Sequence, residues 1–230
     1  MTKTPLVFVV TGGTGALGRA VVLLLLEEGH RVAVPYRGLA GWEALQAKAG
    51  SGRLWGGAAD MSDLAAARRF LDAASGALGG LNGVAAIAGG YSGSGTLETT
   101  PDAEWDEMMR ANLSSAHATC RAALPLLLRG GGSVVTVASR SAEAGGAGAA
   151  AYAVSKMGVV ALTRALAAEN RDRGVRFNAV SPGTIDTEAN RAAMPNADRS
   201  RWTPPEAIAR VVAWLLSPSS APVSGAVVPV

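Results

Sequence analysis

The 230-residue sequence offers little from which a disulfide, a membrane span or a nucleic-acid surface could be built. Its single cysteine, Cys120, cannot form an internal disulfide, which excludes a small disulfide-stapled scaffold. No run of about eighteen uncharged apolar residues occurs, so a membrane span is not expected. The net charge is only +3, and the arginines are scattered without interleaved aromatics, which argues against nucleic-acid binding.

Metal ligands and targeting signals are also scarce. His30 and His117 are the two histidines, and neither belongs to a cluster of ligands, so no metal is expected. Residues 1–4 lack the basic end and apolar core of a signal peptide, and we therefore expect a cytoplasmic protein. With 49% hydrophobic residues and 29 glycines, residues 1–230 are expected to form one compact domain with a large core.

A glycine-rich turn follows the first apolar run. Residues 6–11, LVFVVT, are typical of a parallel strand buried on both faces, and residues 16–28 have the composition of a helix. Glycines between them let the backbone approach a ligand, and the amides at the helix start favour a pyrophosphate. The expected cofactor-binding residues of this turn are Gly12, Gly13, Thr14, Gly15, Ala16, Leu17 and Gly18.

A second predicted strand, residues 31–35, ends at Tyr36 and Arg37. In dinucleotide-binding folds an acid at this place accepts the 2′-OH of NAD, whereas a cation suits the 2′-phosphate of NADP. Because no acid is present, we predict NADP(H), with NAD(H) as the alternative. A third strand ends at Asp60 and Met61, where ligands of open α/β sheets bind, and Ser62 is expected to cap the next helix.

Strands and helices continue to alternate along the rest of the chain. Further strands are predicted at residues 83–90, 132–139, 175–183 and 225–230, and long helices at residues 101–128 and 205–216. This alternation predicts a doubly wound parallel seven-stranded sheet, a Rossmann fold with three α/β/α layers.

Residues 146–169 place Tyr152 and Lys156 four positions apart in a run of helix formers, so both side chains project from one face. A fixed ammonium beside a phenol favours the phenolate, and Lys156 is expected to lower the pKa of Tyr152 toward a useful range. The alternative is an exposed helix on which the pair meets by chance, because YxxxK is short and common. The motif alone leaves both interpretations open.

Taken together, these motifs resemble those of the short-chain dehydrogenase/reductase family over essentially the whole chain. TGGTGALG resembles the cofactor fingerprint of that family, AIAG at residues 86–89 stands where NNAG is usual, and SPGTIDT at residues 181–187 resembles the loop over the nicotinamide. The resemblance implies further cofactor contacts from Asp60, Met61, Ala88, Gly89, Tyr152, Lys156, Pro182, Gly183, Ile185 and Thr187. It also implies four catalytic positions, at Asn112, Ser139, Tyr152 and Lys156.

The family pattern implies a role for each of these four side chains. Ser139 would hydrogen-bond the substrate carbonyl, Tyr152 would exchange the proton, Lys156 would bind the nicotinamide ribose, and Asn112 would support a proton-relay water. Ser139 lies thirteen residues before Tyr152 and closes the fifth strand, whereas Ser141 is expected to point elsewhere.

Three alternatives follow from departures and partial likenesses. Ala16 gives the spacing TGxxGxxG of epimerase-like relatives, but the roughly forty-seven residues after Gly183 are too few for their substrate domain. The segment at residues 185–204 looks like the dihydropteridine reductase branch, which makes a quinonoid pterin an alternative substrate. That branch normally has an acid after its second strand and lacks the Ser and Asn present here. A non-catalytic dinucleotide-sensing protein is the third alternative, because fold does not fix function.

Two segments are expected to shape the pocket for a small-molecule substrate. They are the loop at residues 91–99 and the segment at residues 187–204, whose Arg191, Arg199 and Arg201 favour a small, polar or anionic carbonyl compound. Small residues on the Tyr152 helix and an apolar face on residues 101–128 exceed what one sheet face needs. Family members usually pair these helices across a two-fold axis, so the resemblance implies a homodimer or homotetramer.

Overall fold

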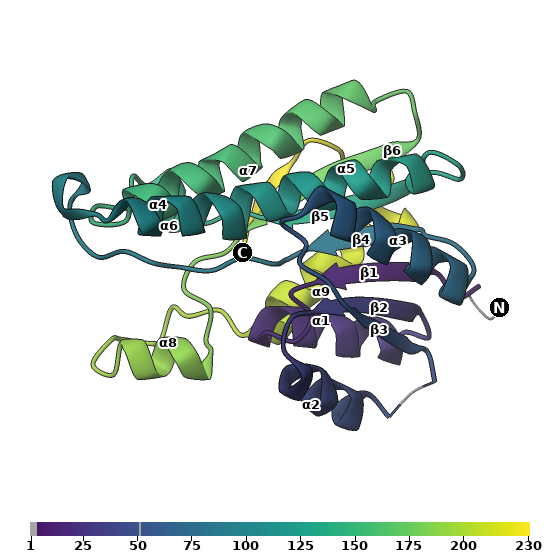
Figure 1. Cartoon of the computed structure of the whole chain (residues 1–230), viewed down its shortest axis with the longest axis horizontal. Coiled ribbons are helices and arrows are strands. Elements are labelled where there is room, and N and C mark those ends of the chain that lie inside the picture. The colour runs from purple at the N-terminus through teal and green to yellow at the C-terminus, as the bar shows by residue number, and fades with distance from the viewer. Residues whose placement is uncertain (1–3, 51) are drawn as a thin grey trace.

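A parallel sheet lies between two layers of helices in the computed structural model, which describes residues 4–50 and 52–230 (Figure 1). Residues 1–3, on which part of the expectation for the chain start rests, lie outside the described residues. The strands are β1 Val7–Thr11, β2 Arg31–Tyr36, β3 Leu54–Ala58, β4 Gly83–Ala86, β5 Gly132–Val137, β6 Val175–Ser181 and β7 Val227–Pro229. The helices are α1 Ala16–Glu27, α2 Leu39–Ala49, α3 Leu64–Leu78, α4 Asp102–Met108, α5 Ser115–Leu127, α6 Arg140–Glu143, α7 Ala150–Glu169, α8 Glu188–Ala193 and α9 Pro205–Leu216.

The strand order is β3-β2-β1-β4-β5-β6-β7, and every neighbouring pair is parallel. The chain winds outward from β1 to β3, returns to β4 beside β1, and then winds outward in the opposite direction to β7. The prediction of a doubly wound, parallel seven-stranded sheet is therefore confirmed. Such a reversal opens a crevice at the carboxyl ends of β1 and β4, where ligands of this fold class bind.

Alternating side chains of the central strands supply both halves of the core. On β1, Val7 and Val9 pack in the cluster that includes residues of α3 and α5, while Phe8 and Val10 pack with residues of α1 and α9. Successive residues of a strand point to opposite faces, and all four side chains are buried because helices cover both faces. The continuous apolar run thus follows from the helical cover on both faces of the sheet.

Two local predictions differ from the structure. The side chain of Asp63, and not that of Ser62, caps α3 by accepting a hydrogen bond from the amide of Ala66 at 2.6 Å. Ser62 instead donates from its amide and its hydroxyl to Asp60, two residues earlier in the chain. Helix α2 was not predicted, because only Trp42 and Leu45 of its residues are buried, and two apolar contacts do not show a helical period.

The predicted continuous helix over residues 101–128 is divided into three parts. Between α4 and α5 the segment Met109–Ser114 forms a π-helical turn, and Asn112 lies in it, 1% exposed. Wide turns of this kind are rare and occur often at functional sites. The side chain of Asn112 therefore lies in the protein interior.

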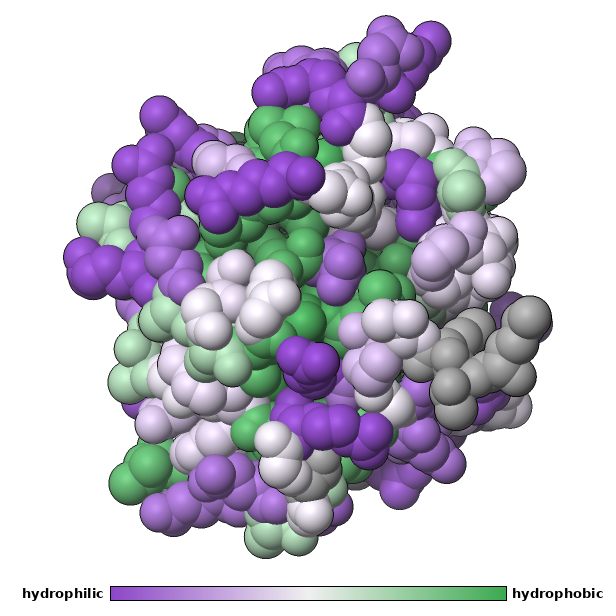
Figure 2. All heavy atoms as spheres, turned by 90° about the vertical axis from the view of Figure 1, so that its right-hand side faces the viewer, coloured by the Kyte–Doolittle hydropathy of each residue, from purple (hydrophilic) through white to green (hydrophobic). Residues whose placement is uncertain are grey.

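The exterior at the end of the sheet where β1 begins carries mainly polar side chains, with apolar residues visible between them (Figure 2). Within residues 4–50 and 52–230, no helix combines the length and apolar character that crossing a membrane requires.

Candidate active site

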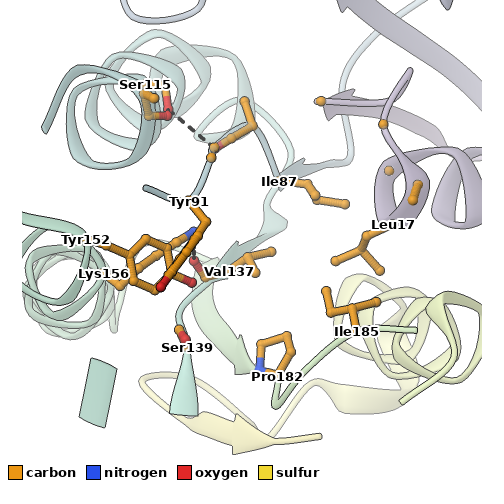
Figure 3. A pocket seen from close by; sticks show the side chains of 18 of the residues that line it. Leu17, Ile87, Tyr91, Ser115, Val137, Ser139, Tyr152, Lys156, Pro182 and Ile185 are labelled. Atoms are coloured by element: carbon orange, nitrogen blue, oxygen red, sulfur yellow. Dashed lines mark hydrogen bonds between the residues drawn. The ribbon is translucent and has the colours of Figure 1, made fainter. Parts of the chain in front are cut away.

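A cleft of about 1210 Å³ lies at the carboxyl ends of the central strands. Its walls come from the turn between β1 and α1, the loops after β2 to β6, and residues of α7 and α8 (Figure 3). This volume is slightly larger than the range of about 300 to 1,000 Å³ typical of small-molecule sites, as a dinucleotide plus a substrate would require. The predicted residues that line the cleft are Gly12, Thr14, Gly15, Ala16, Leu17, Gly18, Tyr36, Arg37, Asp60, Met61, Ala88, Gly89, Ser139, Tyr152, Lys156, Pro182, Gly183 and Ile185.

Three predicted site residues do not line the cleft. Gly13 packs against Val34, and a Cβ atom at this position would lie 2.7 Å from Val34 Cγ1. Thr187 caps α8, where its hydroxyl accepts a hydrogen bond from the amide of Asn190 at 3.1 Å. Asn112 is buried behind the cleft wall. The backbone of Gly13 and the side chains of Thr187 and Asn112 therefore support the walls of the site from outside the cavity.

The turn after β1 fits a dinucleotide pyrophosphate. Gly12 has a φ of +68°, and a Cβ atom there would lie 2.9 Å from the amide nitrogen of Ala88. A Cβ atom on Gly18 would collide with the carbonyl of Gly12, so this contact also requires glycine. Helix α1 begins directly after the turn without a side-chain cap and without acids in its first turn. The amides at the helix start are thus available to an anionic group.

The AIAG segment is held by groups other than the asparagines of the usual family pattern. Thr11, buried at the end of β1, accepts a hydrogen bond from the amide of Ala88 at 3.1 Å. This contact ties the carboxyl ends of β1 and β4 together next to the glycine turn. The Thr11 hydroxyl therefore helps to hold the backbone of the AIAG segment in place.

Charged side chains lie close together where the loops after β2 and β3 line the cleft. Asp60 Oδ2 lies 3.3 Å from Arg110 Nη1, and Arg37 also lines the cleft. Hydrogen bonds from the amide and hydroxyl of Ser62 hold the pKa of Asp60 below its usual range, with smaller contributions from Arg110 and Arg37. Asp60 is therefore ionised at neutral pH. No acid follows β2, so Arg37 faces the cleft without a neighbouring carboxylate in its own loop.

Lys156 is the most strongly buried charged group of the site. Its side chain projects from α7 and is buried. The Nζ atom donates a hydrogen bond of 3.0 Å to the carbonyl of Val137, the last residue of β5. Nζ lies 5.9 Å from the centroid of the Tyr152 ring. Burial lowers the pKa of Lys156 to about 8, because an ammonium removed from water loses its solvation.

Tyr152 differs from the expectation for its protonation. Burial raises the pKa of its phenol above the ordinary value, a hydrogen bond with Ser139 acts in the opposite direction, and Tyr91 raises the pKa further. The expected lowering by Lys156 does not prevail, because the lysine nitrogen is directed to Val137 and is itself desolvated. In this structure Tyr152 is a protonated acid at neutral pH.

The two serines after β5 correct another prediction. Ser139 is buried at the start of α6, and Ser141 was expected to point away from it. Instead Ser139 Oγ and Ser141 Oγ share a hydrogen bond of 2.8 Å, and both residues line the cleft. The short helix α6 turns the chain back immediately after Ser139, so that two residues further along the side chain returns to the same wall.

Asn112 connects the loop after β4 to α7. Its Oδ1 accepts a hydrogen bond from the amide of Gly90 at 3.0 Å, and its Nδ2 donates to the carbonyl of Gly90 at 3.1 Å and to Ser155 Oγ at 3.0 Å. The side-chain amide therefore holds the loop that precedes Tyr91 against the helix that carries Tyr152. Its implied part in supporting a water remains a prediction.

The two predicted substrate segments contribute unequally. The ring of Tyr91 meets that of Tyr152 edge to face, with centroids 4.9 Å apart, and Figure 3 shows both rings at the same end of the cleft. From the second segment, Asn190, Ala193 and Met194 line the cleft. The expected arginines lie elsewhere. In the described chain Arg191 pairs with Asp186 and Arg199 stacks on Trp202, and neither they nor Arg201 line the cleft.

Known proteins place this site in a family. A family model described as enoyl-(acyl carrier protein) reductase matches residues 13–230. Acetoacetyl-CoA reductase of Synechocystis sp. is 35% identical over alignments that cover 92% of this chain and 88% of the relative. The chain belongs to the short-chain dehydrogenase/reductase family.

Other members of the family differ in their named substrates. D-threitol dehydrogenase of Mycolicibacterium smegmatis is 32% identical, with 96% of this chain and 89% of the relative covered. The crystal structure of levodione reductase superposes with a TM-score of 0.91 at 30% identity and covers 98% of this chain and 95% of that chain. Membership of the short-chain dehydrogenases/reductases thus establishes an oxidoreductase that uses NAD(H) or NADP(H), and it leaves the substrate open.

Proposed function

We propose that this protein is a reductase that uses NADP(H) to interconvert a small carbonyl compound and the corresponding alcohol. The observation that carries the proposal is the wall formed by Ser139, Tyr152 and Lys156, which faces the same cleft as the glycine turn. When bound, the nicotinamide cofactor supplies or accepts the hydride, and the side chains of the chain perform the remaining chemistry.

Three side chains divide this work in the proposed reaction. Ser139 donates a hydrogen bond to the substrate carbonyl oxygen, which orients it toward Tyr152. Tyr152 gives its phenolic proton to that oxygen during reduction and takes it back during oxidation. The raised pKa of Tyr152 keeps this proton in place at neutral pH, as proton donation during reduction requires. Lys156, one helical turn away, binds the ribose next to the nicotinamide.

The preference for NADP(H) rests on the end of β2. Arg37 lines the cleft there, and Tyr36 stacks on Trp42 with the ring planes 12° apart, which fixes the start of the loop. A guanidinium binds the 2′-phosphate of NADP, whereas the 2′-OH of NAD requires an acceptor that this loop lacks. Comparison of kcat/KM with NADPH and NADH tests this part, and a preference for NADH contradicts it.

A small substrate is favoured by the part of the cleft beside Tyr152. Tyr91, Ala193 and Met194 line the same cleft as Tyr152, whereas Arg191, Arg199 and Arg201 do not line it. A screen with NADPH against small ketones, quinones and quinonoid dihydropterins distinguishes the carbonyl substrate from the pterin alternative. Efficient turnover of large apolar ketones contradicts the proposal.

We also propose that the chain forms a homodimer or homotetramer through α4 and α7. Val154 and Met157 on α7 are 48% and 41% exposed, and Trp105 on α4 is 38% exposed. Exposed apolar side chains on two helices that pack together support a self-complementary interface. Light scattering tests this assembly, and a monomer at micromolar concentration contradicts it.

The variant Tyr152→Phe tests the proposed chemistry. Phenylalanine keeps the ring and its contact with Tyr91 but removes the transferable proton, so turnover should fall by about 10²- to 10⁴-fold. Binding of NADPH, followed by the shift in melting temperature, should remain measurable in the same variant. Retained turnover refutes the role of Tyr152, while loss of NADPH binding shows that the substitution disturbs more than the proton.

A further inference from the structure

Ser141 lies in a position that the motifs of the family do not explain. It belongs to α6, lines the cleft, and shares the 2.8 Å hydrogen bond with Ser139. Its backbone is fixed, because its carbonyl accepts a hydrogen bond from the amide of Gly146 at 3.0 Å. The amide of Glu143 likewise donates to the carbonyl of Ser139 at 3.2 Å. Both ends of the turn that brings the two hydroxyls together are therefore held.

The number of hydrogens available to the two hydroxyls decides the direction of this hydrogen bond. A serine hydroxyl has one hydrogen to donate and two lone pairs that accept. Ser139 and Tyr152 line the same cleft, and the Ser139 hydroxyl acts to lower the pKa of the Tyr152 phenol. If Ser139 gives its hydrogen to Tyr152 or to a substrate oxygen, the bond between the serines is made only when Ser141 donates.

We propose that Ser141 is a positioning residue, whose hydroxyl donates to Ser139 Oγ and thereby directs the hydrogen of Ser139 toward Tyr152 or the substrate. The three side chains then form a chain of donors that ends at the reacting oxygen. The part concerning substrate rests on the proposed reductase function. The part concerning Tyr152 does not, because it is a property of the protein alone.

A chain of donors stabilises the phenolate more than a single donor does. Each hydroxyl polarises the next, so a hydrogen bond from Ser141 makes Ser139 a better donor to the developing negative charge. Ser141 itself is exposed, and water replaces part of its effect once the hydroxyl is removed. A neutral hydrogen bond contributes about 0.5–1.5 kcal/mol, which corresponds to a twofold to tenfold change in an equilibrium constant.

Several ionisable groups surround Tyr152 and must be distinguished from Ser141. Lys156 lies on the same helix, Tyr91 comes from the loop after β4, and Arg140 and Glu143 lie on α6. Glu143 accepts a hydrogen bond of 2.8 Å from Ser181, which holds its carboxylate at the end of β6. None of these groups is altered by a substitution at Ser141, so a change in the ionisation of Tyr152 in that variant reports the hydroxyl itself.

The test is a direct titration of Tyr152 in the protein without cofactor or substrate. The chain has three tyrosines, and subtraction of the tyrosinate absorbance of Tyr152→Phe isolates one of them. Ser141→Ala should reduce the ionisation constant of Tyr152 by about two- to tenfold. Ser141→Thr, which retains a hydroxyl, should restore the constant, Ser139→Ala should reduce it further, and Ser75→Ala on α3 should leave it unchanged. An unchanged constant in Ser141→Ala overturns the proposal, whatever Ser139→Ala does.

Kinetics then separate this proposal from the proposed function. If the wild-type protein reduces a carbonyl substrate, kcat of Ser141→Ala should fall by about the same factor while the KM for NADPH stays constant. The limb of the pH profile assigned to Tyr152 should shift to higher pH. A protein that shows the titration shift but reduces no substrate refutes the reductase and supports the role of Ser141. A reductase whose Ser141→Ala variant shows neither change refutes only the role of Ser141.

Discussion

Because Lys156 is buried, we predict that replacing it with an uncharged side chain makes the folded protein more stable. The pKa of Lys156 falls from 10.5 to about 8 on burial, which corresponds to about 3 kcal/mol of lost stability while the ammonium is charged. Methionine has a similar length and no charge, so Lys156→Met should remove this penalty. It should also lose the hydrogen bond to Val137, at a cost of about 1–2 kcal/mol. The variant should therefore be more stable by about 1–2 kcal/mol at pH 7, although the proposed function requires it to be inactive.

The stability difference between the wild-type protein and Lys156→Met should change with pH. Below about pH 8 the lysine is protonated in the folded and the unfolded chain, and the full penalty is present. Between about pH 8 and 10.5 the unfolded chain holds the proton that the folded chain has lost, so the stability of the wild-type protein rises with pH relative to the variant. By pH 10.5 the order should be reversed.

Urea unfolding of both proteins from about pH 7 to 10, without cofactor, measures this difference. The background should be Tyr152→Phe, so that ionisation of the neighbouring phenol does not contribute. Lys48→Met is a matched control, because Lys48 is exposed in the last turn of α2 and its removal should give no difference that changes with pH in this way. A Lys156→Met variant that is less stable at pH 7, with a constant difference up to pH 10, would refute the argument from burial.

Two further predictions concern the supports of the cleft. Asn112→Ala removes a buried side-chain amide together with its three hydrogen bonds to Gly90 and Ser155, so urea unfolding should show a loss of about 2–4 kcal/mol. A loss below about 1 kcal/mol would mean that the loop does not depend on this side chain. Arg37→Asp exchanges the cation at the end of β2 for an acid, and the ratio of kcat/KM for NADPH to that for NADH should fall by about ten- to a hundredfold. Arg171→Asp, at an exposed position after α7, is the control, and an equal change in both variants would contradict a specific contact.

The sequence predicted the parallel sheet because burial on both faces leaves a direct trace in β1 and β5. It also predicted that Ser139, Tyr152 and Lys156 lie together, since strand ends and one helix face are regular positions. The π-helical turn at Asn112 left no such trace, because a change in the hydrogen-bond register alters neither the composition nor the apolar pattern of the helix. Ser141 was misplaced for a related reason: the direction of a loop side chain depends on the short helix α6 and not on its distance along the chain.

The YxxxK motif also could not predict the pKa shifts of Tyr152 and Lys156. YxxxK places an ammonium one turn from a phenol, and a charge in water at that distance would lower the pKa of the phenol. In the folded chain both groups are removed from water, which raises the pKa of Tyr152 and lowers that of Lys156. Desolvation depends on the surrounding sheet and helices, so residue spacing cannot supply it.

The end of β5 determines how Lys156, Ser139 and Tyr152 are placed relative to one another. The carbonyl of Val137 accepts the hydrogen bond from Lys156, and Ser139, two residues further along, lines the same cleft as Tyr152. The end of β5 therefore holds the lysine nitrogen and leads directly to Ser139, while α7 carries the lysine and the tyrosine. Ser155, three residues after Tyr152 on α7, connects this joint to Asn112 and hence to the loop after β4. The geometry of the site is thus a property of the joint between β5 and α7, and a substitution that shifts one element against the other should disturb all three groups at once.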